Sequence, residues 1–382
     1  MIRKRGEVVP RILFVDPMAL HGGQERHILY LMKGLHDRGL TVGIAIGQGS
    51  PWEARLRQQW GSRVYVVDYG AKFSAHTLTR LSAIVTQGGY DLIHSHGGRG
   101  GIYGRRLAQR QRIPVVQTWH LNPDEWAGHR WLKRRIYRAG EQFLARHTTY
   151  YIAVSTQIQD TLRHRYGVDT ARVSTILNRV PRKSLDGVRS RPMPVGRAIR
   201  LLSVGRLSEQ KGFPYLLEAL ARLRQEGVPF LMKIAGEGEL RSQLEGMAAR
   251  LELSEQVEFL GYVDPIEPWY QWADIFLLPS LWEGTPLVLL EAASQHMRIV
   301  ATDVGGSGEI LASYPLAAMV PPRSSEALAD AIQAVRRLEA AEAPSMERFF
   351  DVDAMVQEHV AVYERVLRLP SQSPEGRLDT TW

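Results

Sequence analysis

The feature that most constrains the fold of this chain is a repeated alternation of short apolar, β-branched runs with amphipathic stretches. After the first apolar run, "RILFVD" at 11–16, apolar residues recur at helical spacing, at Ile28, Leu31, Met32 and Leu35. A strand, an amphipathic helix and a second strand form the pattern of a right-handed βαβ unit. Its repetition predicts parallel sheets with helices on both faces.

The predicted strands fall into two groups of six, separated by an aperiodic stretch rich in Pro, Arg, Gly and Ser. The first group comprises 11–16, 41–46, 63–68, 91–96, 114–120 and 150–155. The second group comprises 199–205, 230–236, 257–261, 274–280, 298–304 and 317–322. We therefore predict an α/β protein with two Rossmann-like, doubly wound parallel-sheet domains that face each other across a cleft.

These two groups define the expected domains, for which 382 residues are sufficient. We expect an N-terminal domain at 1–182, a linker at 183–198 and a C-terminal domain at 199–350. A helix at 351–368, which can cross back to the N-terminal domain, and a disordered tail at 369–382 complete the predicted organisation.

Composition and motifs exclude several classes of protein. The absence of cysteine excludes disulfides, a thiolate zinc site and a cysteine nucleophile, and it fits a cytoplasmic setting. The sequence contains no run of about 20 apolar residues, the length that a membrane-spanning helix needs. The first apolar run is too short for a signal peptide. The chain also lacks the glycine motifs of P-loop nucleotidases and dinucleotide-binding enzymes.

Charge is distributed unevenly along the chain. Residues 1–185 hold 29 Lys and Arg against 12 Asp and Glu, a net charge of +17, whereas the remainder holds 19 against 28, a net charge of −9. This contrast suggests that the N-terminal half meets an anionic partner. A solvated, arginine-rich surface without a partner is the alternative interpretation.

Glycines and cations mark the loops that follow two predicted strands. Gly22 and Gly23 precede the first helix, where free backbone N–H groups can receive an anion, although an ordinary βα turn would look the same. Arg206 and Lys211 follow the first strand of the second domain. Such a pair suits a diphosphate, although exposed loop cations are often only solvated.

Two glutamates eight positions apart, Glu283 and Glu291, flank the start of a predicted helix whose first residue is expected to be Pro286. The helical rise places their carboxylates on the order of 10 Å apart, which suits an extended nucleotide sugar with hydroxyl groups at both ends. The carboxylate pair of a glycosidase, about 5–9.5 Å apart, is the alternative. That alternative leaves Arg206 and Lys211 without a role.

Taken together, these segments resemble one family. In chain order they are "GGQE", "DLIHSHG", "QTWH", "AVS", "VGRLSEQKG", "GEGEL", "EFLGYV", "ADIFLLPSLWEGTPLVLLEAAS" and "VATDVGG". Their order and spacing are similar to those of the retaining glycosyltransferases of the GT-B fold in family 4, which carry an E-x7-E motif. The resemblance covers essentially the whole chain. It implies a nucleotide-sugar site in the C-terminal domain and an acceptor side in the N-terminal domain.

The resemblance also implies roles for individual residues. The implied catalytic residues are Glu283 and His120, near the transferred sugar, and Arg206 and Lys211, which neutralise the donor diphosphate. The implied donor-binding residues are Gly22, Gly23, Arg206, Lys211, Glu283, Gly284, Leu287, Val288 and Glu291, with Glu291 on the ribose. The donor would be UDP- or GDP-linked, with no cofactor and no metal, because cations and helix ends stabilise the leaving group. No metal role is expected for His94 or His96.

The acceptor side is less constrained by the sequence. The stretch at 125–147 combines aromatic residues with many basic residues. It can rest on anionic lipid headgroups at the inner leaflet or bind an anionic glycan or glycolipid acceptor. Otherwise Trp131 and Tyr137 are core residues and the arginines face water. No nucleic-acid motif is present, so a nucleic acid partner is not expected.

The expected function is retaining transfer of a hexose or N-acetylhexosamine from a nucleotide sugar to a hydroxyl of a cell-surface glycan or glycolipid. Lipopolysaccharide, capsule and exopolysaccharide are the expected products. A nucleotide-sugar 2-epimerase of the same fold, which needs no acceptor, is one alternative. A non-catalytic glycan-binding relative is another, and the presence of Arg206, Lys211, Glu283 and Glu291 argues against it.

Overall fold

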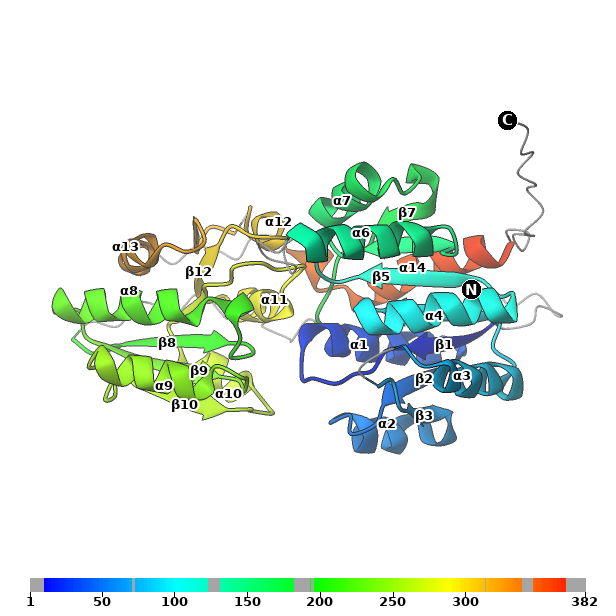
Figure 1. The fold of residues 1–382 in the computed structure, drawn as a ribbon. Coiled ribbons are helices and arrows are strands. Elements are labelled where there is room, and N and C mark those ends of the chain that lie inside the picture. The colour runs from blue at the N-terminus through cyan, green and yellow to red at the C-terminus, as the bar shows by residue number, and fades with distance from the viewer. Residues whose placement is uncertain are drawn as a thin grey trace.

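Two parallel β-sheets organise the chain, each flanked by helices (Figure 1). The structure, a computed structural model, describes residues 10–70, 73–122, 131–181, 193, 196–312, 314–338 and 346–368. Most of the predicted linker at 183–198 and all of the predicted tail at 369–382 therefore lie outside the described residues. The two sheets confirm the predicted α/β fold class.

The N-terminal sheet has seven strands in the order β3-β2-β1-β4-β5-β6-β7. Its strands are β1 (Arg11–Val15), β2 (Thr41–Gly47), β3 (Val64–Val67), β4 (Leu92–His96), β5 (Val115–Trp119), β6 (Tyr150–Ala153) and β7 (Val173–Thr175). The central strands are buried on both faces, so they read as continuous apolar runs rather than alternating ones. The prediction missed β7, because three residues are too few for a periodic pattern.

Helices cover both faces of the N-terminal sheet. They are α1 (Gly23–Asp37), α2 (Glu53–Trp60), α3 (Ala75–Gly88), α4 (Gly98–Gln111), α6 (Trp131–Ala145) and α7 (Thr156–Tyr166), with short 3-10 turns η1 (Gly61–Arg63) and η2 (Thr170–Arg172). Ile12 and Phe14 pack with α1 on one face, whereas Leu13 and Val15 pack with α3 and α4 on the other. The alternation follows from the two-residue period of a strand.

The C-terminal sheet has six strands in the order β10-β9-β8-β11-β12-β13. Its strands are β8 (Ile199–Val204), β9 (Phe230–Ala235), β10 (Val257–Gly261), β11 (Ile275–Leu278), β12 (Arg298–Thr302) and β13 (Ala317–Val320). The flanking elements are η3 (Glu209–Lys211), α8 (Phe213–Gln225), α9 (Arg241–Arg250), α10 (Glu267–Trp272), α11 (Leu287–Ser294), α12 (Ser307–Leu311), α13 (Ser325–Arg336) and η4 (Glu347–Phe349). All twelve predicted strands are observed, within two residues at each end.

The last helix, α14 (Val352–Arg368), packs on α1 of the N-terminal domain. The contact is close, since a Cβ atom added to Gly34 would lie 2.4 Å from the Val356 side chain. The Tyr363 hydroxyl lies 2.7 Å from His94 Nδ1 in the core. Arg179, near the end of the N-terminal domain, forms an ion pair with Glu358. The C-terminal segment is thereby tied to the domain that begins the chain.

Five histidines are buried together where α1, β4, β5 and α14 meet: His27, His94, His96, His120 and His359. Their rings lie in contact, for example 4.2 Å between the centroids of His94 and His96. Burial, reinforced by neighbouring histidines, lowers the pKa of His27, His94 and His96 well below the ordinary value. Burial lowers the pKa of His120 to about 3 and that of His359 to about 4.

This cluster predicts acid-sensitive stability. An unfolded histidine binds a proton near its ordinary pKa of about 6.5, whereas these rings stay neutral in the folded state to much lower pH. The free energy of unfolding should therefore fall as the pH drops below about 6.5, by roughly 1.4 kcal/mol per pH unit for each such histidine. Denaturant titrations between pH 7.5 and 5 would measure the slope, and His359→Gln should reduce it. A constant free energy of unfolding over that range would contradict the prediction.

Candidate active site

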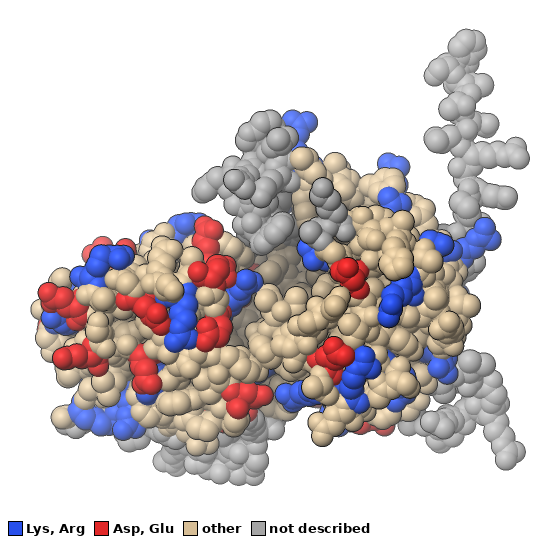
Figure 2. All heavy atoms as spheres, turned by 60° about the horizontal axis from the view of Figure 1, so that its bottom comes forward, with Lys and Arg blue, Asp and Glu red and all other residues tan. Residues whose placement is uncertain are grey.

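The candidate site lies where loops from both sheets meet between the domains. In each sheet the strand order reverses direction at one point, between β1 and β4 and between β8 and β11. Ligands of open parallel sheets bind at such points, outside the carboxyl ends of the strands. The loops after β8 and β11 carry Arg206, Lys211 and Glu283. In the space-filling view the surface is hollowed between the two domains (Figure 2).

Glu283 is a buried carboxylate in the loop after β11. It forms an ion pair with Lys211 and accepts a hydrogen bond of 2.6 Å from the Ser280 hydroxyl, both at Oε1. Gly305 supports this loop in a left-handed conformation, with φ of 56°, and a Cβ atom there would lie 2.1 Å from the Glu283 carbonyl oxygen. Within the described residues, the second carboxylate oxygen of Glu283, Oε2, makes no hydrogen bond or ion pair.

The two predicted cations differ in their surroundings. Lys211 ends η3 and is followed by Gly212 in a left-handed conformation, where a Cβ atom would lie 2.1 Å from the Pro279 carbonyl oxygen. This contact fixes the β8 loop against the β11 loop. Arg206 is half-exposed and pairs with exposed Glu239 at 3.0 Å. Because exposed pairs contribute little free energy, the Arg206 guanidinium can exchange Glu239 for an anionic ligand.

Glu291, in α11, has partners from both domains. Arg26 of α1 forms an ion pair with Oε1, and the Tyr270 hydroxyl donates a hydrogen bond of 2.9 Å to Oε2. Burial disfavours the charged form of Arg26, but Glu291 more than compensates, so the pKa of Arg26 is raised. No local pattern in the sequence indicates a role for Arg26, because its partner lies 265 residues further along the chain.

The start of α11 differs from the prediction. Pro286 was expected as the first helical residue, but it is the N-cap in an extended conformation, with ψ of 110°, and α11 begins at Leu287. Leu287 is buried and lies against the glycine loop of the other domain, since a Cβ atom on Gly23 would be 3.6 Å from Leu287 Cγ. Val288 is half-buried, and its carbonyl oxygen accepts a hydrogen bond from Tyr270.

A glycine allows the two domains to touch beside Glu283. A Cβ atom on Gly284 would lie only 1.8 Å from the His120 carbonyl oxygen. The next residue, Thr285, donates its hydroxyl hydrogen bond to the Val154 carbonyl oxygen, and Asn178 donates to the Thr285 carbonyl oxygen at 3.1 Å. The backbones of the segments that follow β5 and β11 are therefore in direct contact, which places His120 next to the loop of Glu283.

Glu25 lies near Arg206 of the candidate site, and the sequence analysis does not select it. It is buried at the start of α1, and its Oε2 would lie 2.7 Å from a Cβ atom on Gly22. Burial raises the pKa of Glu25 to about 7, although backbone N–H groups and the nearby Arg206 oppose the shift. A glutamate three residues after the N-cap Gly22 has the spacing of a capping box, and this was the signal available in the sequence.

Three of the buried histidines could hold a metal ion. His27, His96 and His120 each offer a ring nitrogen within 4.8 Å of the others, and His96 Nδ1 lies 3.0 Å from His120 Nε2. Within the described residues, neither nitrogen of His27 makes a hydrogen bond of standard geometry, although the Asn178 side chain is close enough to favour its charged form weakly. An all-imidazole set suits zinc or copper rather than magnesium.

Comparison with known proteins identifies the family. The model described as "Glycosyl transferases group 1" matches residues 198–337, and that described as "Glycosyl transferase 4-like domain" matches residues 22–179. An uncharacterised glycosyltransferase of Haemophilus influenzae is 30% identical over 298 residues, covering 75% of this chain and 79% of the relative. The chain therefore belongs to the glycosyl transferases of group 1, which form glycosyltransferase family 4, and it is a glycosyltransferase.

Further similarity concerns a relative named for a specific transfer reaction, and a solved structure. The Escherichia coli UDP-Gal:alpha-D-GlcNAc-diphosphoundecaprenol alpha-1,3-galactosyltransferase is 28% identical over 242 residues, covering 60% of this chain and 62% of that enzyme. The structure of Anabaena HepE in complex with UDP superposes with a TM-score of 0.73 and 21% identity, covering 93% of this chain and 100% of HepE. The structural similarity to HepE confirms the GT-B fold.

The contact at Gly284 gives a direct test of how the domains meet. In Gly284→Ala the new methyl group would overlap the His120 backbone, so the domains should be held apart and nucleotide-sugar turnover should fall by about 100-fold, as for an ångström-scale misplacement. Released nucleoside diphosphate measures turnover, and small-angle X-ray scattering measures domain separation. Gly246→Ala is the matched control, because its Cβ atom would meet only the Arg250 side chain at 3.6 Å. Equal turnover in the two variants would refute the role of Gly284.

Proposed function

We propose that the protein is a retaining, metal-independent glycosyltransferase. It moves a hexose or N-acetylhexosamine from a nucleoside-diphosphate sugar to a hydroxyl of a glycan or glycolipid acceptor. One observation carries the proposal. A buried carboxylate, Glu283, is paired with the half-buried Lys211 at the β8/β11 switch point, and Gly23 and His120 approach the same loops from the other domain.

Donor binding would use the charges already in the cleft. Arg206 and Lys211 would hold the diphosphate, because a guanidinium fork and an ammonium group match phosphate oxygens. Glu291 would accept hydrogen bonds from the ribose diol in exchange for one of its present partners, Arg26 or Tyr270. The free oxygen of Glu283 would bind hydroxyl groups of the transferred sugar.

The reaction would proceed on one face of the sugar. The bond between the anomeric carbon and the donor phosphate oxygen breaks, the acceptor oxygen bonds to the same face, and the acceptor proton passes to the departing phosphate oxygen. Arg206 and Lys211 would stabilise the negative charge of the leaving nucleoside diphosphate. Because burial keeps the pKa of His120 at about 3, His120 would act as a neutral hydrogen-bonding group beside the sugar.

Relatives support the class of acceptor and donor. The Escherichia coli relative is named for transfer from a UDP-sugar to a diphosphoundecaprenol-linked sugar, and the Anabaena structure contains UDP. By similarity, we propose a UDP-linked donor, with GDP as the alternative, and an acceptor in the synthesis of a lipopolysaccharide, capsule or exopolysaccharide. The cationic N-terminal half agrees with an anionic glycan or glycolipid.

The role of Lys211 predicts a loss of nucleotide binding. Lys211→Ala should weaken UDP or GDP binding about ten- to hundredfold, because a hydrogen bond between charged groups contributes about 1.5–3 kcal/mol. Titration calorimetry measures the affinity. Lys233→Ala is the control, since Lys233 also pairs with a glutamate, Glu258, away from the cleft.

Removing Lys211 also leaves Glu283 without its cation, which could weaken binding indirectly. The double variant Lys211→Ala/Glu283→Gln separates the two effects, because no uncompensated carboxylate remains. If Lys211 contacts the diphosphate, the double variant should still bind weakly. Restoration of wild-type affinity in the double variant would show that Lys211 serves Glu283 alone.

The product distinguishes transfer from the alternatives. The enzyme incubated with a UDP-sugar and a matching lipid-linked or oligosaccharide acceptor should yield a glycosylated acceptor, whose anomeric configuration by NMR equals that of the donor. Mass spectrometry of donor and enzyme alone should show no isomerised sugar. Isomerisation without acceptor would indicate a 2-epimerase, and nucleotide binding without turnover would indicate a non-catalytic relative.

A further inference from the structure

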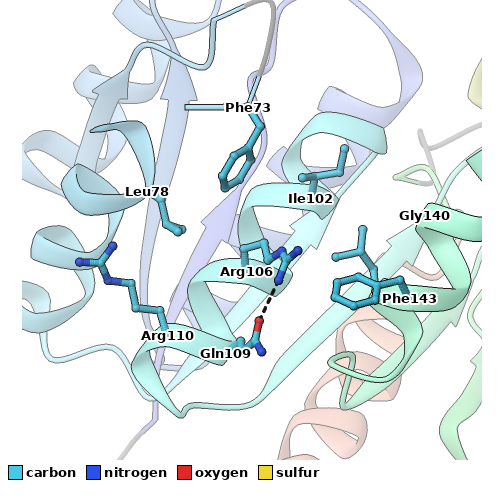
Figure 3. Close-up of a pocket in the computed structure, with 9 residues that line it drawn as sticks. Phe73, Leu78, Ile102, Arg106, Gln109, Arg110, Gly140 and Phe143 are labelled. Carbon is cyan, nitrogen blue, oxygen red and sulfur yellow. Dashed lines mark hydrogen bonds between the residues drawn. The ribbon is translucent and has the colours of Figure 1, made fainter. Parts of the chain in front are cut away.

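A groove on the N-terminal domain lies between α3, α4 and α6, apart from the residues of the donor site. Its volume is about 510 Å³. Apolar side chains line it, as Figure 3 shows: Phe73 and Leu78 from one wall, Ile102 from α4 and Phe143 from α6. Leu144 of α6 lines it as well. Two of its walls, α4 and α6, are joined by the buried ion pair between Arg105 and Glu141.

The rim of the groove exposes large hydrophobic side chains. Phe73, Ile102 and Phe143 are 53%, 39% and 45% exposed, and Ile136, on α6, is 66% exposed. These four are half of the large exposed hydrophobic side chains in the described part of the chain. Single exposed apolar residues are normal, but a contiguous group around a groove indicates an interaction surface.

The same face carries positive charge without acidic residues to balance it. Arg99, Arg106 and Arg110 of α4 are exposed or half-exposed. Arg106 and Arg110 line the groove, and Arg99 lies one helical turn before Ile102. Glu141 is the sole acidic residue of α3, α4 and α6, and it is buried against Arg105. Arg106 also stacks 4.8 Å over the Phe143 ring, so a cation sits directly beside the apolar rim. By contrast, Figure 2 shows both signs intermixed over the C-terminal domain.

We propose that this face docks the protein on an anionic phospholipid bilayer. The arginines would lie at the level of the lipid phosphates, the rim residues would insert at the headgroup boundary, and the groove would receive an acyl chain. An anionic lipid can make both kinds of contact: its headgroup can pair with the arginines, and its acyl chain can enter the apolar groove. None of the described helices is long and apolar enough to cross a bilayer, so the contact is peripheral.

Vesicle co-sedimentation tests the docking. The full chain should bind vesicles that contain about a third phosphatidylglycerol and not pure phosphatidylcholine, and added salt should weaken the binding. Arg99→Glu, Arg106→Glu and Arg110→Glu together should lower the partition coefficient at least fivefold for each reversed charge, since a basic residue near such a surface contributes about 1 kcal/mol. Arg250→Glu with Arg337→Glu, exposed on the other domain, should have little effect.

The apolar rim has its own matched controls. Phe73→Ser, Ile102→Ser and Phe143→Ser together should reduce vesicle binding about tenfold or more, because each buried CH₂ contributes about 0.8 kcal/mol. Leu231→Ser with Met319→Ser, both 43% exposed on the C-terminal domain, should not. Circular dichroism and thermal unfolding confirm that each variant is folded, and UDP binding should be unchanged because none of these residues belongs to the donor site.

The absence of cysteine allows the groove itself to be probed. A fluorophore on Ile102→Cys should be quenched by lipids labelled in the acyl chain, and one on Leu231→Cys should not. Equal binding to neutral and anionic vesicles, equal losses in face and control variants, or an unquenched label at position 102 would overturn the proposal. Dimerisation, or binding to acidic oligosaccharides without vesicles, would overturn it too. Vesicle docking and UDP binding are separate readouts, so this proposal can fail while the proposed function stands.

Discussion

Burial of acidic side chains in the interdomain cleft is the constraint on which the site depends. A carboxylate withdrawn from water is costly unless it is paired and hydrogen-bonded. Glu283 meets this requirement through Lys211 and Ser280, and Glu291 through Arg26 and Tyr270. The first pair joins two loops of one domain, whereas the second joins the two domains. Charge compensation thus organises the C-terminal site and also draws α1 toward it.

Small residues permit the close approach that these charges favour. Gly23 lies against Leu287, and Gly284 lies against the His120 backbone. The contact at Gly284 leaves no room for a side chain, so this glycine belongs to the geometry of the site as much as the charged groups do. Ligand binding would exchange internal partners for substrate groups while the backbones stay in place. This arrangement is a preorganised electrostatic environment, in which little reorganisation accompanies the reaction.

The N-terminal domain separates two kinds of polar chemistry. Its interior holds the cluster of buried histidines, which includes His120 and which burial keeps uncharged. Its outer face on α3, α4 and α6 holds exposed arginines beside apolar side chains. Part of the excess positive charge in the first half of the sequence therefore comes from exposed arginines on these helices. The buried histidines do not contribute to it at neutral pH.

The sequence by itself determined the strand–helix order, the α/β class and the loops that carry Lys211 and Glu283, because these follow from local periodicity and from the rule that ligands bind at strand ends. Only the tertiary structure decided that Pro286 caps α11 rather than begins it, that Arg26 pairs with Glu291 and that Glu25 is buried with a raised pKa. The histidine cluster and the groove likewise combine segments from several elements. Burial and pairing arise between residues far apart in the chain, and a local pattern does not encode them.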